Sequence, residues 1–393
     1  MVPDDPEQTM KHSSGSKTGD RQAGPEYRRL FDGAIEDTFR QALRIVSQYP
    51  AILPEAVKIA WYQKKAAGIR RKFERKGLLV PPVVIISVTS RCNLACAGCY
   101  MKQRNGNAPE MRPDLFSSVI EEAAGLGVGI IVIAGGEPLM RKDEILSVAW
   151  THPRILFPLF TNGLMIDDNS AKEIGCLKNI VPMISFEGSR NDTDDRRGKG
   201  VYDRLLKSCS ALQQNGIFFG CSVTVTSRNL PGVTDEEFIR GMVRGGARVF
   251  VFVEYVPIEP GTEDLVLTRD QQVTLHTRIS LLENQFPALF IGFPGDETRY
   301  GGCLAAGRGF IHVSSSGGVE PCPAAPFSDA NLADISLRDA LQSPFFAKIR
   351  LNHTKLTETN GGCALWTNRA WAKDLLTPAY APERAATNKP PDP

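Results

Sequence analysis

Between residues 83 and 255, short apolar runs alternate with helical segments, and this alternation restricts the fold more than any other feature of the chain. The helical segments, such as 114–127, 201–216 and 234–246, carry apolar residues at three- and four-residue spacing. The apolar runs are residues 83–88, 129–134, 155–160, 181–186, 218–225 and 249–255. Apolar strands that alternate with helices form parallel sheets covered by helices. The pattern therefore predicts an α/β fold with a six-stranded open sheet or an incomplete barrel.

Other patterns flank this core on both sides. Residues 27–50 and 54–77 each show helical periodicity and predict an N-terminal helical segment over 26–79. Beyond Thr262 the strand–helix alternation is predicted to stop. One helix is expected near 268–286 and another over 336–350, with a loop-rich part between them. The expected division is a barrel over 80–260 and a smaller domain over 261–376.

Both ends of the 393-residue chain are expected to be disordered, because residues 1–25 are polar and residues 377–393 are rich in Pro and Ala. The N-terminus lacks the apolar core of a secretory signal, and no run of about 18 apolar residues occurs. A cytoplasmic location is therefore predicted. The formal charge of +2 gives no reason to expect nucleic acid as a partner.

The second N-terminal helix is strongly basic. Its basic side chains are expected to form either a solvated face or a surface that binds an acidic peptide or an anionic membrane. Peripheral membrane contact is thus one of the alternatives for this helix. Its basic residues are Lys58, Lys64, Lys65, Arg70, Arg71, Lys72, Arg75 and Lys76.

Three cysteines, Cys92, Cys96 and Cys99, lie on one loop directly after the first apolar run. We call them the loop cysteines. In a cytoplasmic protein, clustered cysteines are more often metal ligands or reactive groups than disulfides. A structural zinc site normally takes four ligands. In a 4Fe–4S cluster each of four irons takes one outer ligand, so three thiolates leave one iron open.

Three further motifs follow the next apolar runs. Residues 135–138 read GGEP, residues 161–163 read TNG, and residues 185–188 read SFEG. Because the carboxyl ends of parallel strands meet at one side of a sheet or barrel, these motifs and the cysteine loop are expected to lie together. Ligands of such folds collect at that side.

The cysteine loop resembles the cluster motif of the radical S-adenosylmethionine (radical SAM) superfamily, and GGEP resembles its methionine-binding motif. The resemblance implies a partial (β/α)6 TIM-like barrel in which the loop cysteines hold a 4Fe–4S cluster and S-adenosylmethionine (SAM) chelates the fourth iron. It implies reductive cleavage of SAM to a 5′-deoxyadenosyl radical, which abstracts hydrogen from a substrate. A reductant such as flavodoxin or ferredoxin is implied as a partner. The implied methionine-binding residues are Gly135, Gly136, Glu137 and Pro138.

The resemblance also suggests further contacts to SAM. Tyr100, directly after the third cysteine, takes the adenine-side role. Asn162 either contacts the ribose or shapes a turn. Ser185 and Glu187 resemble the fourth-strand residues that face SAM and substrate, and they alternate with apolar neighbours as inward-facing residues do.

Residues 194–203 resemble a loop and helix start of peptide-modifying family members, in which an arginine meets the methionine carboxylate. Arg197 is the candidate for this role, with Arg196 nearly equal. The alternative is an ordinary exposed basic loop.

Cys303, Cys322 and Cys363, which we call the late cysteines, lie in a stretch that resembles the auxiliary-cluster domains named SPASM and Twitch. Trp366 stands where a partner of Cys363 would be expected, so the set is incomplete. One reading is an auxiliary 4Fe–4S cluster with an open or non-cysteine fourth position. The alternatives are a hydrogen-donor role for Cys363, as in peptide epimerases, and a degenerate or zinc-binding domain.

The remaining cysteines fall on helix- or strand-patterned stretches and are predicted to be buried small apolar residues. The five histidines show no metal-ligand spacing and are predicted to be structural. These residues are Cys176, Cys209, Cys221, His12, His152, His276, His312 and His353.

Together these features predict a radical SAM oxidoreductase or maturase with a SPASM/Twitch-like auxiliary domain. The substrate class stays open between a peptide side chain and a small molecule such as a sugar, amino acid or lipid. Redox-neutral epimerisation or carbon–carbon bond formation is the alternative within enzymes. A non-catalytic iron–sulfur or zinc protein is the alternative of another class.

Overall fold

The computed structural model describes residues 53–104, 109–293, 300, 302–356 and 363–376, together with a few residues between 33 and 45. Its centre is a nine-stranded sheet in the order β7-β6-β5-β4-β3-β2-β1-β8-β9. All neighbouring strands are parallel except β8 and β9, which form an antiparallel pair. The strands are β1 (Val83–Ser87), β2 (Ile130–Ala134), β3 (Phe157–Thr161), β4 (Ile180–Phe186), β5 (Phe219–Val225), β6 (Ala247–Glu254), β7 (Leu289–Phe293), β8 (Phe310–Val313) and β9 (Val319–Glu320).

The six predicted strands are all present as β1 to β6, displaced by at most two residues at their starts. The prediction that the alternation stops beyond Thr262 is wrong. Helix α10 (Arg269–Gln285) is followed by β7, which pairs in parallel with β6. At the other side of the sheet, β8 pairs in parallel with β1. The late part of the chain therefore completes the same sheet instead of standing apart from it.

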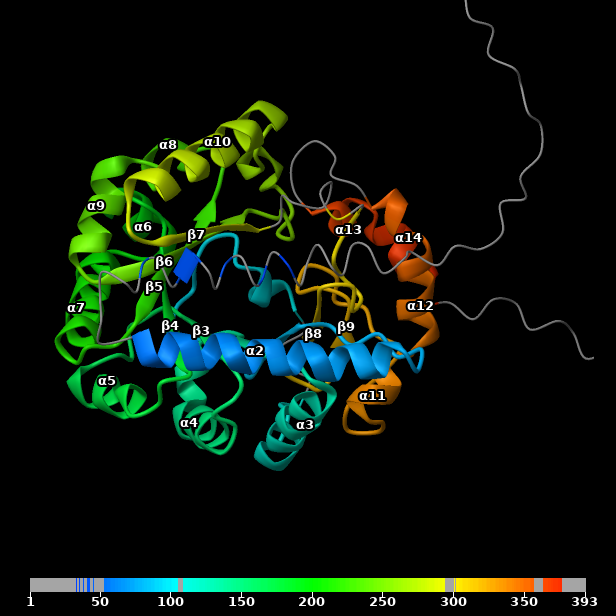
Figure 1. Cartoon of the computed structure of the whole chain (residues 1–393). Helices are drawn as coiled ribbons and strands as arrows, with labels where there is room; N and C mark the ends of the chain where they lie inside the picture. The colour runs from blue at the N-terminus through cyan, green and yellow to red at the C-terminus, as the bar shows by residue number, and fades with distance from the viewer. Residues whose placement is uncertain are drawn as a thin grey trace, which may run out of the picture.

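Helices surround the outer face of the curved sheet (Figure 1). Apolar side chains from both layers, such as Ile86, Phe186 and Phe116, fill the space between them and are almost completely buried. The helices of this layer are α3 (Pro113–Leu126), α4 (Lys142–Thr151), α5 (Asp168–Gly175), α6 (Arg190–Arg197), α7 (Val201–Gln214), α8 (Leu230–Val233) and α9 (Glu236–Arg244), followed by α10.

The inner face of the sheet carries a second, smaller apolar cluster. Met183, Val249 and Leu289 pack there with Ile45 from the N-terminal part of the chain. Most of the predicted helix over 27–50 lies outside the described residues. The second predicted helix is α2 (Leu53–Glu74), which crosses in front of the sheet in Figure 1.

The C-terminal part corrects one more prediction. Residues 336–350 form two helices, α11 (Leu337–Ala340) and α12 (Pro344–Leu351), instead of one. Ser343 caps α12 by accepting a hydrogen bond from the Phe346 amide (3.2 Å), and Pro344 occupies the first helical position. Two short helices follow, α13 (Ala364–Thr367) and α14 (Arg369–Asp374). The two predicted disordered ends lie outside the described residues.

Candidate functional site at the carboxyl ends of the strands

The cysteine loop leaves the sheet at the carboxyl end of β1 and returns through a short 3-10 helix, η2 (Tyr100–Gln103). Cys92 is exposed, and Cys96 and Cys99 are partly buried. Strand β1 lies between β2 and β8, so the loop is flanked by the ends of strands from both parts of the chain. The motifs at the strand ends were predicted to lie around this loop, and the following contacts join several of them to it.

Gly135 and Gly136 let the end of β2 approach the cysteine loop backbone to backbone. The Gly136 amide donates to the Thr89 carbonyl (2.8 Å), and the Glu137 amide donates to the Arg91 carbonyl (2.8 Å). A Cβ atom at position 136 would lie 2.0 Å from the Arg91 carbonyl oxygen. Glycine is therefore required here by the protein's own close packing.

Glu137 ties the ends of β2 and β3 together. Its fully buried carboxylate accepts hydrogen bonds from the Leu139 amide (3.0 Å), the Thr161 hydroxyl (2.6 Å) and the Asn162 amide (2.8 Å). Burial raises the pKa of this carboxyl group, while the same hydrogen bonds oppose the shift. Its implied role in binding the methionine part of SAM stays a prediction.

Two other residues of these motifs have structural contacts. Pro138 is buried at the first position of the 3-10 helix η3 (Pro138–Arg141). The Asn162 side chain accepts a hydrogen bond from the Leu164 amide (3.1 Å), so it shapes the turn after β3. The side-chain nitrogen of Asn162, Nδ2, also lies 2.6 Å from the Asn93 side-chain oxygen and 3.7 Å from the Cys92 sulfur. Asn162 thus reaches the first loop cysteine.

The end of β4 presents a buried carboxylate held by two arginines. One oxygen of Glu187 accepts from Arg196 (2.5 Å) and from two nitrogens of Arg197 (2.8 and 2.6 Å). Its other oxygen is buried and has no hydrogen-bond partner among the described residues. Met183 packs in the inner cluster, so Ser185 and Glu187, at the next odd positions, face the same inner side.

Arg196 also clamps the cysteine loop. Its side chain donates to the Ala97 carbonyl (3.2 Å), and its own carbonyl accepts from the Ala97 amide (3.0 Å). Ala97 lies between Cys96 and Cys99, so the end of α6 holds the second half of the loop. These contacts exclude the alternative of an ordinary exposed basic loop for Arg196 and Arg197, whose side chains are 18% and 10% exposed.

Sequence reasoning missed three residues that hold the loop. Glu110 accepts from the Thr89 hydroxyl (2.5 Å) and the Ser90 amide (3.0 Å). Glu259 accepts from the Gly98 amide (2.9 Å), and the ring of Tyr255 packs against Gly98 so closely that a Cβ there would lie 2.5 Å from its hydroxyl oxygen. No local pattern marks these residues: Glu110 follows Cys99 by 11 residues outside any motif, and Tyr255 and Glu259 follow β6, far away in sequence.

Tyr100 lies between the loop and the late part of the chain. The Arg104 guanidinium lies 5.7 Å from the centre of its ring. Burial raises the pKa of the Tyr100 hydroxyl, and the charge of Arg104 and the Ser87 hydroxyl oppose this shift. The predicted adenine-side role of Tyr100 stays a prediction.

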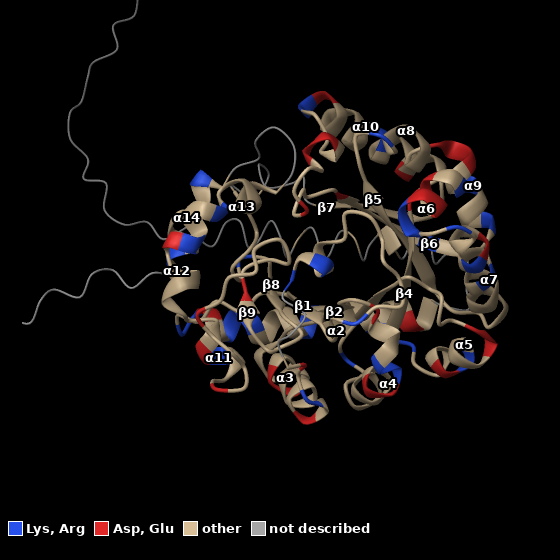
Figure 2. Ribbon diagram, turned by 180° about the vertical axis from the view of Figure 1, so that it is seen from behind, with Lys and Arg blue, Asp and Glu red and all other residues tan. Residues whose placement is uncertain are grey.

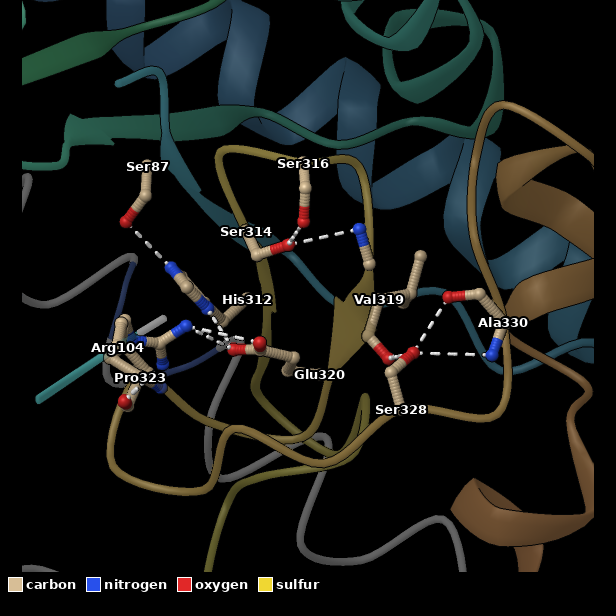
Figure 3. Close-up of polar contacts among 11 residues, drawn as sticks. Ser87, Arg104, His312, Ser314, Ser316, Val319, Glu320, Pro323, Ser328 and Ala330 are labelled. Carbon is tan, nitrogen blue, oxygen red and sulfur yellow. Dashed lines mark hydrogen bonds and ion pairs between the residues drawn. The ribbon is translucent and has the colours of Figure 1, made fainter. Parts of the chain in front are cut away.

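A buried polar network continues from there into β8 and β9 (Figure 3). His312 lies between Ser87 (2.8 Å) and Glu320 (2.6 Å), and its side chain is fully buried. Arg104 contacts both oxygens of Glu320 (3.0 and 2.8 Å) and donates to the carbonyl of Pro323. Ser87 precedes the cysteine loop and Arg104 follows it, whereas Glu320 and Pro323 lie on either side of Cys322. The network thus binds both ends of the loop to the segment that carries Cys322.

The late cysteines are buried together. Each is 5% or 6% exposed. The thiol of Cys363 is a hydrogen-bonding neighbour of Cys322, and this contact together with burial raises the pKa of Cys322 well above its usual range; Cys303 contributes through its charge. The structure therefore brings the three late cysteines together although they span 61 positions of the sequence, from 303 to 363.

Within the described residues, no three Cys, His, Asp or Glu side chains converge on one ion position. The loop cysteines supply thiolates, the ligand type of which a 4Fe–4S cluster takes one for each iron. The Leu94 amide lies 3.4 Å from the Cys92 sulfur and supplies the kind of N–H···S contact that tunes such clusters.

Residues 86–241 match the family model described as the radical SAM superfamily. They form a radical SAM domain. The match contains the loop cysteines and the ends of β1 to β5. It confirms the superfamily indicated by the resemblance, and with it the 4Fe–4S cluster and SAM as cofactors. It also confirms the predicted function class, a radical SAM enzyme that cleaves SAM to start radical chemistry on a substrate.

Three relatives extend this similarity. The Fe-coproporphyrin III synthase of Methanosarcina barkeri is 31% identical over 160 residues, which are 39% of this chain and only 40% of that relative. The AdoMet-dependent heme synthase of the same organism is 28% identical over 330 residues, 77% of this chain and 93% of the relative. The mycofactocin maturase MftC of Mycolicibacterium smegmatis is 28% identical over 266 residues, 64% of this chain and 66% of the relative.

Among solved structures, SuiB of Streptococcus suis bound to S-adenosylmethionine superimposes with a TM-score of 0.59 at 18% identity. The match covers 76% of this chain and 72% of SuiB. It confirms the predicted partial-barrel fold. Within the described residues, no helix is both long enough and apolar enough to cross a bilayer.

Proposed function

We propose that this radical SAM enzyme oxidises a peptide side chain and uses the two cysteine sets as two cluster sites. When bound, the cluster on the loop cysteines and SAM supply a 5′-deoxyadenosyl radical that takes a hydrogen atom from the substrate. To reach a closed-shell oxidised product, the substrate radical must then lose one proton and one electron. The late cysteines, in a SPASM/Twitch-like segment, would hold the auxiliary 4Fe–4S cluster that accepts this electron.

One observation carries the proposal. The late cysteines are buried together, and their segment is bound to the cysteine loop through Arg104 and Glu320. Arg104 follows Cys99 by five residues, and Glu320 precedes Cys322 by two. This arrangement favours electron transfer between the two sites, because the same hydrogen bonds orient both segments.

The strand ends supply the groups that would orient SAM. Gly135 and Gly136 place the end of β2 against the loop, and Asn162 lies beside Cys92. The unpartnered oxygen of Glu187 is an acceptor for a cationic group such as the SAM ammonium. Ser185 lies one inward-facing position before it. Because these groups sit on strand ends instead of long loops, their geometry is fixed by the sheet.

Arg197 is a better candidate than Arg196 for the methionine carboxylate. Within the described residues the guanidinium of Arg197 hydrogen bonds only to Glu187. Arg196 is used additionally to hold the Ala97 carbonyl of the cysteine loop. A carboxylate could therefore approach Arg197 without loosening the loop.

A peptide substrate is supported by the relatives of known name. MftC is described as a maturase, and a SuiB structure is described as bound to the precursor peptide SuiA. A second candidate is a tetrapyrrole, because the AdoMet-dependent heme synthase matches over 93% of its own length. A sugar, an amino acid derivative and a lipid are the remaining alternatives.

Redox-neutral chemistry is the alternative to oxidation. In that case Cys363 would return a hydrogen atom to the substrate radical. Its thiol is 6% exposed and adjacent to Cys322, which favours a ligand role over a donor role. A non-catalytic iron–sulfur protein is disfavoured by the radical SAM match.

The decisive experiment is anaerobic reconstitution with iron and sulfide, followed by dithionite and SAM. We expect 5′-deoxyadenosine, formed faster when the true substrate class is added. A precursor peptide and Fe-coproporphyrin III are the two substrates to compare. A protein that holds iron and binds SAM but forms no 5′-deoxyadenosine with any reductant or substrate would contradict the proposed reaction.

Iron counting tests the auxiliary site separately. Replacing the late cysteines together by alanine should remove about four irons per chain. The Cys176→Ala variant is the control, because Cys176 is exposed and far from both sets in sequence. An unchanged iron content in the triple variant would exclude the auxiliary cluster.

The proposal also includes an electron donor, a cellular location and a division of the chain into domains. A flavodoxin or ferredoxin is the expected electron donor, in agreement with a cytoplasmic location. The division at 260/261 places α10 and β7 with the auxiliary part, although β7 pairs with β6 of the barrel. If two domains exist, they share one sheet.

A further inference from the structure

The first half of α2 exposes a row of large apolar side chains. Leu53, Val57 and Trp61 are 39%, 52% and 50% exposed. Residues four positions apart lie on nearly the same side of a helix, so these three form one strip. A folded chain normally exposes such residues singly, and a strip of three marks a contact surface.

The second half of the same exposed side is cationic. No ion pair joins any of its six basic side chains to another described residue, and Lys65 additionally lies 3.6 Å over the Trp61 ring. Only Arg70 of the basic residues in this half of the helix is buried, where it donates to the Gly127 carbonyl (2.8 Å). The six exposed residues are Lys64, Lys65, Arg71 and Lys72 of α2 and Arg75 and Lys76 of the turn that directly follows it.

A second exposed tryptophan extends the surface beyond α2. Trp150, at the end of α4, is 72% exposed. It borders a groove of about 320 Å³ that is also lined by Lys58 and Tyr62 of α2 and by Lys178. Tryptophan rings favour the boundary between water and lipid, and clustered cations on a helix attract anionic head groups.

The position of α2 argues against an electron donor as the partner. Gln63 and Arg70 hold the Gly129 and Gly127 carbonyls, which directly precede β2. Helix α2 therefore crosses the amino ends of the strands, whereas the loop cysteines follow the carboxyl end of β1. Figure 2 shows the molecule from the side opposite to α2. A nucleic acid would match the cations but leave the apolar strip without a partner.

We propose that α2 docks the protein on the surface of an anionic lipid bilayer. Leu53, Val57 and Trp61 would enter the headgroup region, and the cations of the second half would lie among anionic head groups. The carboxyl ends of the strands, with the cysteine loop, then face away from the lipid. This inference is independent of the proposed reaction.

Vesicle co-sedimentation of the full chain tests the proposal. We expect binding to phosphatidylcholine vesicles that contain phosphatidylglycerol, none to phosphatidylcholine alone, and weaker binding at higher salt. The variant Lys64→Gln/Lys65→Gln/Lys72→Gln should bind about a hundredfold more weakly, since each cation contributes a factor of about five. Trp61→Ala should bind about tenfold more weakly at unchanged charge.

The matched control removes three exposed cations elsewhere: Arg204→Gln/Lys207→Gln/Arg278→Gln on α7 and α10. It should bind like the parent, and circular dichroism should show all variants folded. The proposal is overturned if the control triple loses as much binding as the α2 triple. It is equally overturned if the parent ignores anionic vesicles but binds duplex DNA or polyglutamate through the same lysines.

Discussion

At the scale of single residues, His312 shows how the late part of the chain is bound to the cysteine loop. Its ring lies between the Ser87 hydroxyl and the Glu320 carboxylate, and Arg104 binds the same carboxylate (Figure 3). The prediction that this histidine is structural agrees with its complete burial among protein partners. Buried polar networks of this kind hold their members in one arrangement, because an unpaired member would be costly.

The pH dependence of stability should report on His312. Burial lowers the pKa of its imidazole, the Arg104 charge adds to this, and Glu320 opposes it. Below the unfolded pKa of about 6.5, the unfolded chain then binds more protons than the folded one, so stability falls as the pH falls. We expect the difference in free energy of unfolding between the parent and His312→Gln to shrink from pH 8 to pH 5. Parallel curves for the two proteins would contradict this.

Replacing each of the two arginines that bind Glu187 should affect a different property of the protein. Arg196→Gln removes a contact to the cysteine loop and is expected to lower the iron content after reconstitution. Arg197→Gln leaves the loop contacts intact and should weaken SAM binding about tenfold, the loss of one charged hydrogen bond. Iron analysis and SAM titration of both variants check this, and the same loss of iron in both would show that the roles are not divided.

The cysteines outside the two sets differ in burial, which corrects one prediction from the sequence and leads to a prediction about thiol reactivity. Cys209 and Cys221 are buried as predicted, but Cys176 is exposed, because it ends α5 with its thiol directed to the Lys172 carbonyl on the surface. Burial raises the pKa of Cys209 to about 12.

In the folded protein at pH 8, Cys209 should therefore react with iodoacetamide about a thousandfold more slowly than the exposed Cys176. Mass spectrometry of the alkylated protein measures both rates, with the unfolded protein as the reference in which they converge. Equal rates in the folded state would mean that α7 opens readily.

At the scale of elements, the end of β2 and the cysteine loop depend on each other. The Gly136→Ala variant would place a methyl group 2.0 Å from the Arg91 carbonyl oxygen. We expect it to destabilise the protein by about 3 kcal/mol and to lower iron binding, since the loop must move.

Gly125→Ala is the matched control. Gly125 lies within α3, and a Cβ there meets nothing within 4 Å. This change should stabilise the protein by up to about 1 kcal/mol. Chemical unfolding of both variants gives the comparison, and a mild effect at position 136 would show that the loop has room to shift.

At the scale of the whole molecule, the parallel pairing of β8 with β1 makes the late part of the chain a structural part of the barrel. Strand β1 has β2 on one side and β8 on the other, and Val84 and Ile86 are fully buried beneath the outer helices. The carboxyl end of this strand starts the cysteine loop. The late part of the chain therefore supports the cysteine loop through the pairing of β8 with β1.

A fragment that ends at Phe293 should consequently fail to form the native monomer, because β1 becomes an unprotected edge strand. We expect aggregation and binding of a hydrophobic dye, measured by size-exclusion chromatography and fluorescence. A fragment that ends at Leu376 serves as the control and should unfold like the full chain. A monomeric, cooperatively unfolding 1–293 fragment would instead support two independent domains.

Much of this architecture could be predicted from local patterns. The six strands followed from apolar runs, and the loop cysteines and GGEP followed from contiguous motifs. Strand β7 was missed because its run is short and comes after a helix of weak amphipathic pattern. The contacts of Gly98 with Glu259 and of Arg104 with Glu320 join residues 161 and 216 positions apart, and no local pattern encodes such pairs.

By itself, the sequence determined the parallel α/β core, the cluster-binding loop and the superfamily, because these depend on periodicity and on short motifs. Only the tertiary structure decided which groups surround that loop: the shared carboxylate of Glu187, the clamp of Arg196 and the contacts of Arg104 with Glu320 and Pro323. It also decided that the late cysteines, separate in sequence, are buried together. The physical reason is that these contacts arise where strand ends from the whole chain meet, and their partners are chosen by the path of the sheet.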